Sequence, residues 1–193
     1  TEIVANSYRS SFFDPSEIGV ATARAGNVIG GGDFSAKRLV PDILEASNNG
    51  NELGLRYPNA IRPWQHVFDV LWGYLVLAEK LTKDFKKFSS GWNFGPSKHS
   101  NLTVLELVKM FNVLGLNSSL KWSIADGASI VKEAKSLLLN STKANKHLSW
   151  INAMSIEQSI QAIIDWNHSY VHNLSLQETS RKQVESYLEK ILK

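Results

Sequence analysis

The chain has 193 residues, of which 43% are hydrophobic and 20% are charged, and it contains no cysteine. This length is enough to bury a core, and the apolar and aromatic content excludes a disordered protein. The lack of cysteine excludes disulfide frameworks, thiol catalysis and thiolate zinc sites. The net charge is only +3 with both signs interspersed, so the charge does not indicate nucleic-acid binding.

Membrane and metal association are not indicated either. No apolar run approaches the roughly 18 residues that span a bilayer, and the first residues lack the basic and apolar segments of a signal peptide. The five histidines are scattered without metal-ligand spacing, so we expect no metal site. We expect a soluble cytoplasmic protein with no membrane partner.

The N-terminal residues predict a helix followed by a strand. Residues 1–13 place apolar side chains at helical spacing, as one buried stripe, with no capping residue ahead of them. The small, β-tolerant residues 19–25 suit a buried strand that ends at Gly26. A helix that leads into a strand indicates an α/β protein, and the abrupt beginning is typical of a helix entered partway along its length.

Periodicity, turn residues and capping patterns predict the later elements. Two helices open on capping boxes, one formed by Thr103 with Glu106 and one by Ser155 with Gln158. The predicted helices cover residues 41–46, 69–81, 103–114, 142–150, 156–166 and 183–193. The predicted strands cover residues 53–57, 92–94 and 121–124. This alternation again predicts an α/β fold.

A glycine-rich loop follows the first predicted strand. Glycine lets backbone N–H groups approach a phosphate closely, so Gly26-x-x-x-Gly30-Gly31-Gly32 could touch a phosphate or a dinucleotide. Its spacing matches neither the Rossmann fingerprint nor the Walker pattern, and a flexible turn is the other interpretation. Asn27 and Arg38, close by in the sequence, could both donate hydrogen bonds to phosphate oxygens.

The segment IRPWQHV gathers polar chemistry that a simple connector would not need. Pro63 and Trp64 hold the Arg62 guanidinium stiffly, and its planar fork suits bidentate contact with a diphosphate. A structural arginine stacked on Trp64 is the alternative. His66 could carry a proton, although an ordinary buried histidine is the simpler interpretation. We expect the tryptophans, including Trp72 and Trp166, to belong to cores.

Together these segments resemble a known family. The runs ATARAGNVIGGGDFSAKRLVPDIL, NAIRPWQHVFDVLWGYLVLAEKL and GWNFGP are similar to the CDP-glucose 4,6-dehydratases, a branch of the NAD-dependent extended short-chain dehydrogenase/reductases that act on sugar nucleotides. The shared motifs are Arg-x-x-Asn-x-x-Gly from Arg24, Arg-x-Trp from Arg62 and Asn-x-Gly from Asn93. SYRSSFF resembles the helix that carries the family's catalytic Tyr-x-x-x-Lys.

The resemblance implies a Rossmann-type α/β fold with a small mixed α/β substrate domain. It implies a remnant of the NAD-binding domain in residues 1–30, a sugar-nucleotide-binding domain in 31–174 that returns to the Rossmann sheet around 61–96, and a C-terminal helix in 175–193. The family's Tyr-x-x-x-Lys would fall just before Thr1, so the resemblance implies the C-terminal part of an enzyme that is inactive alone. No catalytic and no cofactor-binding residue is assigned.

The resemblance also implies substrate contacts. Asn27 matches the strand-end amide that meets the diphosphate or the sugar, and Arg62 matches the arginine that grips the diphosphate. Arg38, just before Leu39, occupies a basic position that helps to hold the nucleotide. Residues 53–57 border the base, with Arg56 as a further nucleotide contact. Asn93 matches an asparagine near the phosphates, although a turn-forming role fits it equally well.

The implied reaction converts CDP-glucose to a CDP-4-keto-6-deoxyhexose and water, on a route into surface polysaccharides, with NAD as the hydride carrier and a homo-oligomer as the assembly. Two alternatives stay open: another sugar-nucleotide epimerase or dehydratase of the superfamily, or a non-catalytic sugar-nucleotide-binding or oligomerisation fragment. Two departures from the family stand out. The sequence has Lys132-Glu133-Ala134 and then Ser136 where the family has His-Glu-Ala and an aromatic residue, and Ser149 replaces a turn glycine.

Overall fold

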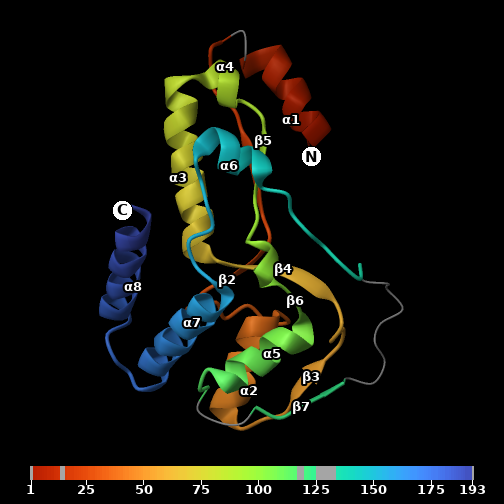
Figure 1. The fold of residues 1–193 in the computed structure, drawn as a ribbon, viewed down its shortest axis with the longest axis vertical. Coiled ribbons are helices and arrows are strands. Elements are labelled where there is room, and N and C mark those ends of the chain that lie inside the picture. The colour runs from red at the N-terminus through yellow and green to blue at the C-terminus, as the bar shows by residue number, and fades with distance from the viewer. Residues whose placement is uncertain (1, 14–15, 117–119, 125–133, 193) are drawn as a thin grey trace.

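Small sheets and helices alternate along the chain in a computed structural model that describes residues 2–13, 16–116, 120–124 and 134–192 (Figure 1). The helices are α1 Glu2–Tyr8, α2 Leu39–Asn49, α3 Val67–Lys83, α4 Phe85–Phe88, α5 Val104–Val113, α6 Thr142–Leu148, α7 Ile156–Val171 and α8 Leu176–Ile191. The strands are β1 Thr22–Ala25, β2 Asn27–Ile29, β3 Leu53–Leu55, β4 Ile61–His66, β5 Gly91–Phe94, β6 Asn101–Thr103 and β7 Trp122–Ile124. A π-helix at Arg9–Phe13 and a 3₁₀ turn at Lys98–Ser100 complete the described elements.

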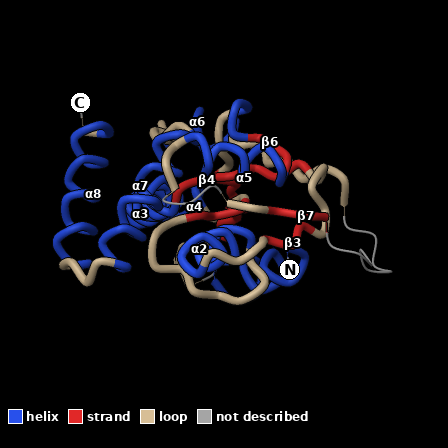
Figure 2. Tube along the Cα trace, turned by 90° about the horizontal axis from the view of Figure 1, so that it is seen from below, coloured by secondary structure: helices blue, strands red, loops and turns tan. Residues whose placement is uncertain are grey.

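The strands form three sheets at different levels of an elongated molecule. One end holds the parallel pair β1–β5 with α1, α3, α4 and α6, and the other holds the parallel pair β3–β7 with α2, α5 and α7 (Figure 1). Between them lies β2–β4–β6, in which β2 runs parallel and β6 antiparallel to β4. The chain therefore passes repeatedly from one end to the other, and the view from below shows α8 standing beside this body (Figure 2).

The crossing from β1 to β2 depends on one glycine. A Cβ at Gly26 would overlap the carbonyl oxygen of Pro63 on β4, so no larger residue fits there. Pro63 is tolerated inside β4 because β2 pairs only with residues 64–66 and β6 only with residues 61–63. Pro63 thus has a partner strand on one side only, and its missing N–H interrupts no second ladder.

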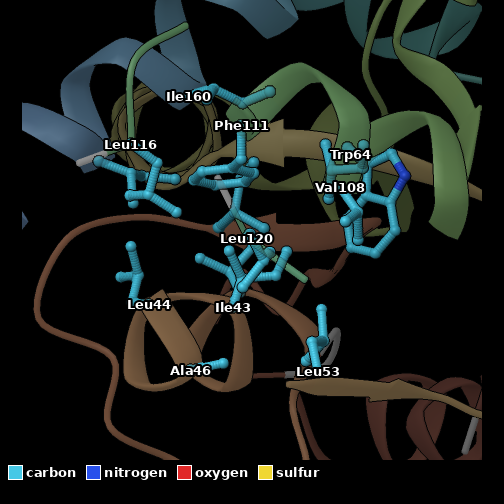
Figure 3. Close-up of a cluster of buried hydrophobic side chains, with 14 of the residues drawn as sticks. Ile43, Leu44, Ala46, Leu53, Trp64, Val108, Phe111, Leu116, Leu120 and Ile160 are labelled. Carbon is cyan, nitrogen blue, oxygen red and sulfur yellow. The ribbon is translucent and has the colours of Figure 1, made fainter. Parts of the chain in front are cut away.

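Each end of the molecule has its own hydrophobic cluster. The larger one gathers α2, α5 and α7 around fully buried residues that include Ile43, Phe111 and Ile160, and Trp64 packs at its margin (Figure 3). The smaller cluster lies between α3, β5 and α6 and centres on Trp92, Phe94 and Trp150. Trp72 packs against this smaller cluster, as expected from its helical position.

The N-terminal residues differ from the sequence expectation. Instead of one buried helix, α1 is followed by a π-helix, and the apolar stripe faces outward, with Ile3 85% exposed. Val4, Tyr8 and Phe12 are also more than half exposed. The outward stripe is therefore an exposed apolar surface, a feature that marks interaction sites in many proteins.

Both predicted capping boxes are confirmed. The side chains of Thr103 and Ser155 each accept from the backbone N–H of the N3 residue, and that residue's side chain reaches back to the cap. Most helices are longer than predicted, notably α2 and α8. Ser149, at the position of the family's turn glycine, adopts the left-handed conformation with φ 54°, so a serine builds this turn with the backbone that glycine favours. None of the helices in the described ranges combines the length and the apolar character that a membrane crossing requires.

Candidate functional site

A cavity of about 510 Å³ opens beside β2 and β4 and beneath the start of α2. Five of the six residues predicted to bind substrate line it: Asn27, Arg38, Leu39, Arg56 and Arg62. They come from five different elements or loops, spread over residues 27–62 of the sequence. The fold therefore brings together residues that the sequence analysis named one by one, from their chemistry or from the resemblance.

Positive charge dominates the polar lining. Four cationic residues, Lys37, Arg38, Arg56 and Arg62, face the cavity together with two carboxylates, Asp33 and Asp42. The first turn of α2 also borders the cavity, and the N-terminal end of a helix carries partial positive charge. A lining of this composition favours an anionic ligand.

Arg62 is the most deeply placed of these cations. It lies in β4, opposite Leu102 of β6, and is only 7% exposed. Its Nη1 donates to the backbone oxygen of Ile61 at 2.8 Å. Neighbouring Trp64 donates from Nε1 to the backbone oxygen of Leu102 at 3.0 Å, which locks β4 and β6 together beside the cavity. Arg62 is thus held on a rigid strand, the arrangement that a precise anion contact requires.

Arg38 is held more loosely, at the rim. It precedes α2 in extended conformation, and its guanidinium pairs with Asp33 at 3.3 Å while most of its side chain is exposed. Partial burial alone would raise the pKa of Asp33, but hydrogen bonds from Ser35 and the charge of Arg38 outweigh it and lower that pKa. Because an exposed ion pair contributes little stability, Arg38 can exchange Asp33 for a ligand oxygen at small cost.

The far wall combines a second rim cation with apolar surface. Arg56 is exposed and donates from Nη2 to the backbone oxygen of Lys37 at 3.3 Å. Burial raises the pKa of Asp42, although hydrogen bonding and the charge of Arg56 act against that rise. Leu53 and Leu55 present the apolar part of this wall, and Tyr57 is half-buried next to them. This wall suits a ligand that has both a planar ring, which would lie against the apolar surface, and phosphate groups, which would meet the arginines.

Asn93 stands apart from this cavity. It lies in β5, where it pairs with Arg24 of β1, and it is absent from the lining. Its Nδ2 donates to the backbone oxygen of Asn140 at 3.3 Å, and its Oδ1 is buried without a partner in the described part of the chain. The structure does not bring Asn93 together with the other five predicted residues.

His66 has a structural place in the fold. It is buried, caps α3 by accepting from the backbone N–H of Phe68 at Nδ1 over 3.3 Å, and packs edge-on to the Phe68 ring. Burial lowers its pKa to about 4. A neutral, buried imidazole at neutral pH agrees with the simpler of the two interpretations and not with a proton carrier. Among the residues that the structure describes, no group of three or more metal-ligating side chains is gathered.

Several lining residues were not predicted. Asp33, Lys37 and Asp42 border the cavity, and the signal for Asp33 was present in the sequence as a carboxylate two residues before Ser35, whose N–H it accepts at 2.9 Å. Lys132 and Glu133 lie outside the described residues. The segment after them runs beside the start of β4, where the backbone N–H of Ile61 donates to the oxygen of Lys135 and that of Leu137 donates to the oxygen of Ile61.

Comparison with known proteins finds a relative in sequence. The CDP-glucose 4,6-dehydratase of Salmonella typhimurium is 38% identical over an aligned stretch that covers 97% of this chain and 53% of that enzyme. The chain therefore spans about half the length of this relative. No family profile matches the chain.

Solved structures show the same fold at low sequence identity. The UDP-glucuronic acid 4-epimerase of Bacillus cereus matches with a TM-score of 0.71 and 16% identity, over 88% of this chain and 50% of the epimerase. The dTDP-glucose 4,6-dehydratase of Bacillus anthracis matches with a TM-score of 0.69 and 18% identity, over 89% of this chain and 50% of that enzyme. Both of those structures contain NAD. In sequence the chain is similar to about half of the Salmonella typhimurium CDP-glucose 4,6-dehydratase, and it has the α/β fold of the corresponding half of these solved epimerase and dehydratase structures.

Proposed function

We propose that the cavity beside β2 and β4 binds the nucleoside diphosphate part of a sugar nucleotide, with CDP-glucose as the first candidate. The observation that carries this proposal is the convergence of four cations and an apolar wall on one cavity of about 510 Å³. A diphosphate needs the cations and a base needs the wall. The sequence relative supports cytidine as that base.

Each residue has a distinct task in this proposal. Arg62, fixed on β4, grips the diphosphate, and Arg38 leaves Asp33 to close over it from the rim. Asn27, at the start of β2, donates its amide to a phosphate or sugar oxygen. Leu39 and Arg56 border the nucleoside. Asn93 stays a prediction without a contact to this cavity.

We further propose that a protein containing this chain dehydrates CDP-glucose to a CDP-4-keto-6-deoxyhexose, as the resemblance implies. These 193 residues hold neither a Tyr-x-x-x-Lys pair nor a Gly-x-x-Gly-x-x-Gly motif, so the isolated chain is expected to bind and orient substrate without turnover. Positioning of this kind is a large part of catalysis. We expect the protein to act in the cytoplasm.

NAD supplies hydride uptake and return when it is bound. In the part of the chain that the structure describes, the glycine loop after β2 does not form a cradle for it, because Gly31 and Gly32 pack against the Trp166 ring. We therefore propose that NAD is held mainly by residues other than these 193, and we assign it no step here.

Two alternatives are favoured by specific observations. The UDP-sugar epimerases share the fold, so a site for another nucleotide sugar is the second candidate. The exposed apolar stripe of α1 supports a non-catalytic oligomerisation role, and we propose that this stripe is buried in a homo-oligomer or against another part of a larger protein.

Replacing Arg62 with alanine is expected to weaken CDP binding by roughly 1.5–3 kcal/mol, the scale of a charge-assisted hydrogen bond. Isothermal titration calorimetry of the 193-residue chain measures this loss, with thermal unfolding as a check of the fold. Arg181→Ala is the matched control, because Arg181 is exposed on α8 and pairs there with Glu178 and Glu185. Equal CDP affinity in Arg62→Ala and in the parent chain would remove Arg62 from the site.

A further inference from the structure

The glycine loop after β2 rests directly on α7. A Cβ at Gly31 would lie 2.6 Å from the Cβ of Trp166 and closer still to its Cγ, and Gly32 sits beside the same ring with a φ of +80°. Real side chains do not approach this closely, so only glycine lets the backbone of residue 31 lie on the indole. These two glycines serve close packing, which neither the phosphate-loop nor the flexible-turn interpretation included.

Phe34 extends the contact along the same face of α7. Its ring lies 6.2 Å from that of Trp166 and 5.1 Å from that of Tyr170, measured between centroids, and Trp166 and Tyr170 stack at 6.0 Å. Phe34 is 66% exposed, and it contacts the rings of Trp166 and Tyr170 at the surface of the protein. Residues 31–34 are therefore attached to one helix through aromatic and glycine contacts.

The same loop forms one wall of the cavity. The cavity is lined by Gly30 and Asp33 from the first part of the loop and by Lys37 and Arg38 from the end of the loop. Asp33 fixes the turn by accepting from the Ser35 N–H and pairs with Arg38. Arg38 is also the N-cap residue of α2, and its backbone oxygen accepts from the Asp42 N–H at 3.0 Å, so the exposed residues 35–38 are held between α2 and the attached residues 31–34.

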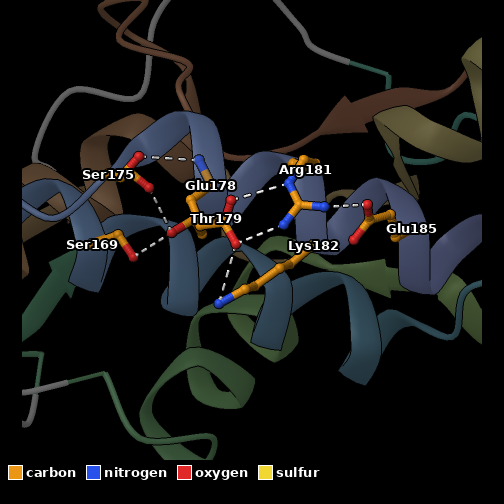
Figure 4. Close-up of polar contacts among 7 residues, drawn as sticks. All are labelled: Ser169, Ser175, Glu178, Thr179, Arg181, Lys182 and Glu185. Atoms are coloured by element: carbon orange, nitrogen blue, oxygen red, sulfur yellow. Dashed lines mark hydrogen bonds and ion pairs between the residues drawn. The ribbon is translucent and has the colours of Figure 1, made fainter.

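Helix α8 supports Trp166 from the other side. The indole Nε1 donates to the Ser180 hydroxyl at 3.1 Å. Two further contacts dock α8 on α7. The hydroxyls of Ser169 and Thr179 lie 2.9 Å apart (Figure 4). Gln183 donates to the backbone oxygen of Ala162 at 2.8 Å. The ring is thus fixed between α8 and the glycine loop.

We propose that Trp166 is a positioning residue for the nucleotide cavity. It touches no ligand itself; it holds residues 31–34 so that Asp33 and Arg38 stand at the rim, and Ser180 of α8 holds the ring. This inference rests on the proposed function, because the effect it names is on nucleotide affinity. It gives α7 and α8 a role at a cavity that neither helix lines.

The test uses the complete 193-residue chain, CDP as the probe and Trp166→Leu as the variant. Calorimetry is expected to show at least a tenfold loss of CDP affinity, and amide hydrogen exchange without ligand is expected to speed up in residues 31–38. Gly31→Ala should produce the same two effects, because its methyl group forces the loop off α7. Trp166→Phe, which keeps a flat ring for Gly31, should retain most of the affinity.

Trp72→Leu is the matched control, because Trp72 is also half-buried on a helix but packs against the smaller cluster. It should leave CDP affinity within twofold and exchange in residues 31–38 unchanged. Parent-like CDP affinity in a folded Trp166→Leu variant would overturn the positioning role. If Trp166→Leu does not fold, parent-like affinity in Gly31→Ala would overturn it equally. Absence of CDP binding by the parent chain would instead reject the proposed function, while faster exchange in Trp166→Leu would still show that the ring anchors the loop.

Discussion

Replacing Asp69 with alanine is expected to lower the free energy of unfolding by about 3–5 kcal/mol, because it leaves buried donors without an acceptor. The Asp69 carboxylate is fully buried and accepts from the Ala153 N–H at 2.8 Å, the Met154 N–H at 3.3 Å and the Tyr187 hydroxyl at 2.9 Å. It thereby joins the start of α3 to the segment before α7 and to α8. Urea unfolding followed by circular dichroism measures the loss.

Asp84→Ala is the control for this variant. Asp84 caps α4 by accepting from the Lys87 N–H, but it is exposed, so its loss should cost only about 1 kcal/mol. Tyr187→Phe removes one of the three donors and should lie between the two. An Asp69→Ala loss no larger than that of Asp84→Ala would show that the buried network does not hold α8 in place.

Acidification is expected to destabilise the protein through His66. Burial lowers the pKa of His66 from 6.5 to about 4, so between these values the unfolded chain binds a proton that the folded chain does not. The stability that the neutral imidazole contributes is therefore complete above pH 6.5 and is lost as the pH falls toward 4, by up to about 3 kcal/mol.

His66→Asn isolates this contribution, because asparagine can still cap α3 but does not titrate. The drop in unfolding free energy between pH 7.5 and pH 4.5, from urea titrations, should be smaller in the variant than in the parent chain. Burial also raises the pKa of Asp69, which acts in the opposite direction, so the difference between the two chains is the informative quantity. His147→Asn, at an exposed position, should leave the parent's pH dependence in place. An identical pH dependence in His66→Asn and the parent would contradict the neutral, buried state of His66.

Structural features that depend only on residues close together in the chain were predicted correctly from the sequence. The capping boxes at Thr103 and Ser155 are local hydrogen-bonding patterns, and both helices begin where these patterns place them. The resemblance placed segments around 61–96 in the sheet, but the residues themselves did not predict a strand at 61–66, and Pro63 is unfavourable within a strand. That residue is acceptable only because β2 and β6 pair with different halves of β4, which is a property of the assembled sheet.

Contacts between segments that are distant in the chain could not be predicted from the sequence. Asp69 and Tyr187 are 118 residues apart, and nothing in either local pattern shows that one accepts a hydrogen bond from the other. The packing of Gly31 on Trp166 was missed for the same reason, and the glycines were interpreted only through chemistry that glycine commonly serves. The outward stripe of α1 was expected to be buried because periodicity shows that a face is apolar without showing what covers it.

At the candidate site, too, some residues were predicted from the sequence and others became evident only in the folded structure. Side-chain chemistry and the resemblance both named Arg38 and Arg62, the resemblance alone named Arg56, and the fold places all three around one cavity. It also named Asn93, which the fold places in the β1–β5 sheet, away from that cavity. Lys37 was passed over because an exposed lysine carries no pattern of its own, and only the folded loop shows that it faces the same space.

The most direct test of the proposed nucleotide site is a calorimetric titration of the 193-residue chain with CDP and CDP-glucose, compared with the corresponding UDP, dTDP and GDP compounds. The proposal predicts saturable binding of CDP and CDP-glucose, at least tenfold tighter than binding of the other nucleotides. Preference for UDP compounds would support the epimerase alternative. Absence of binding by every nucleoside diphosphate would contradict the assignment of this cavity.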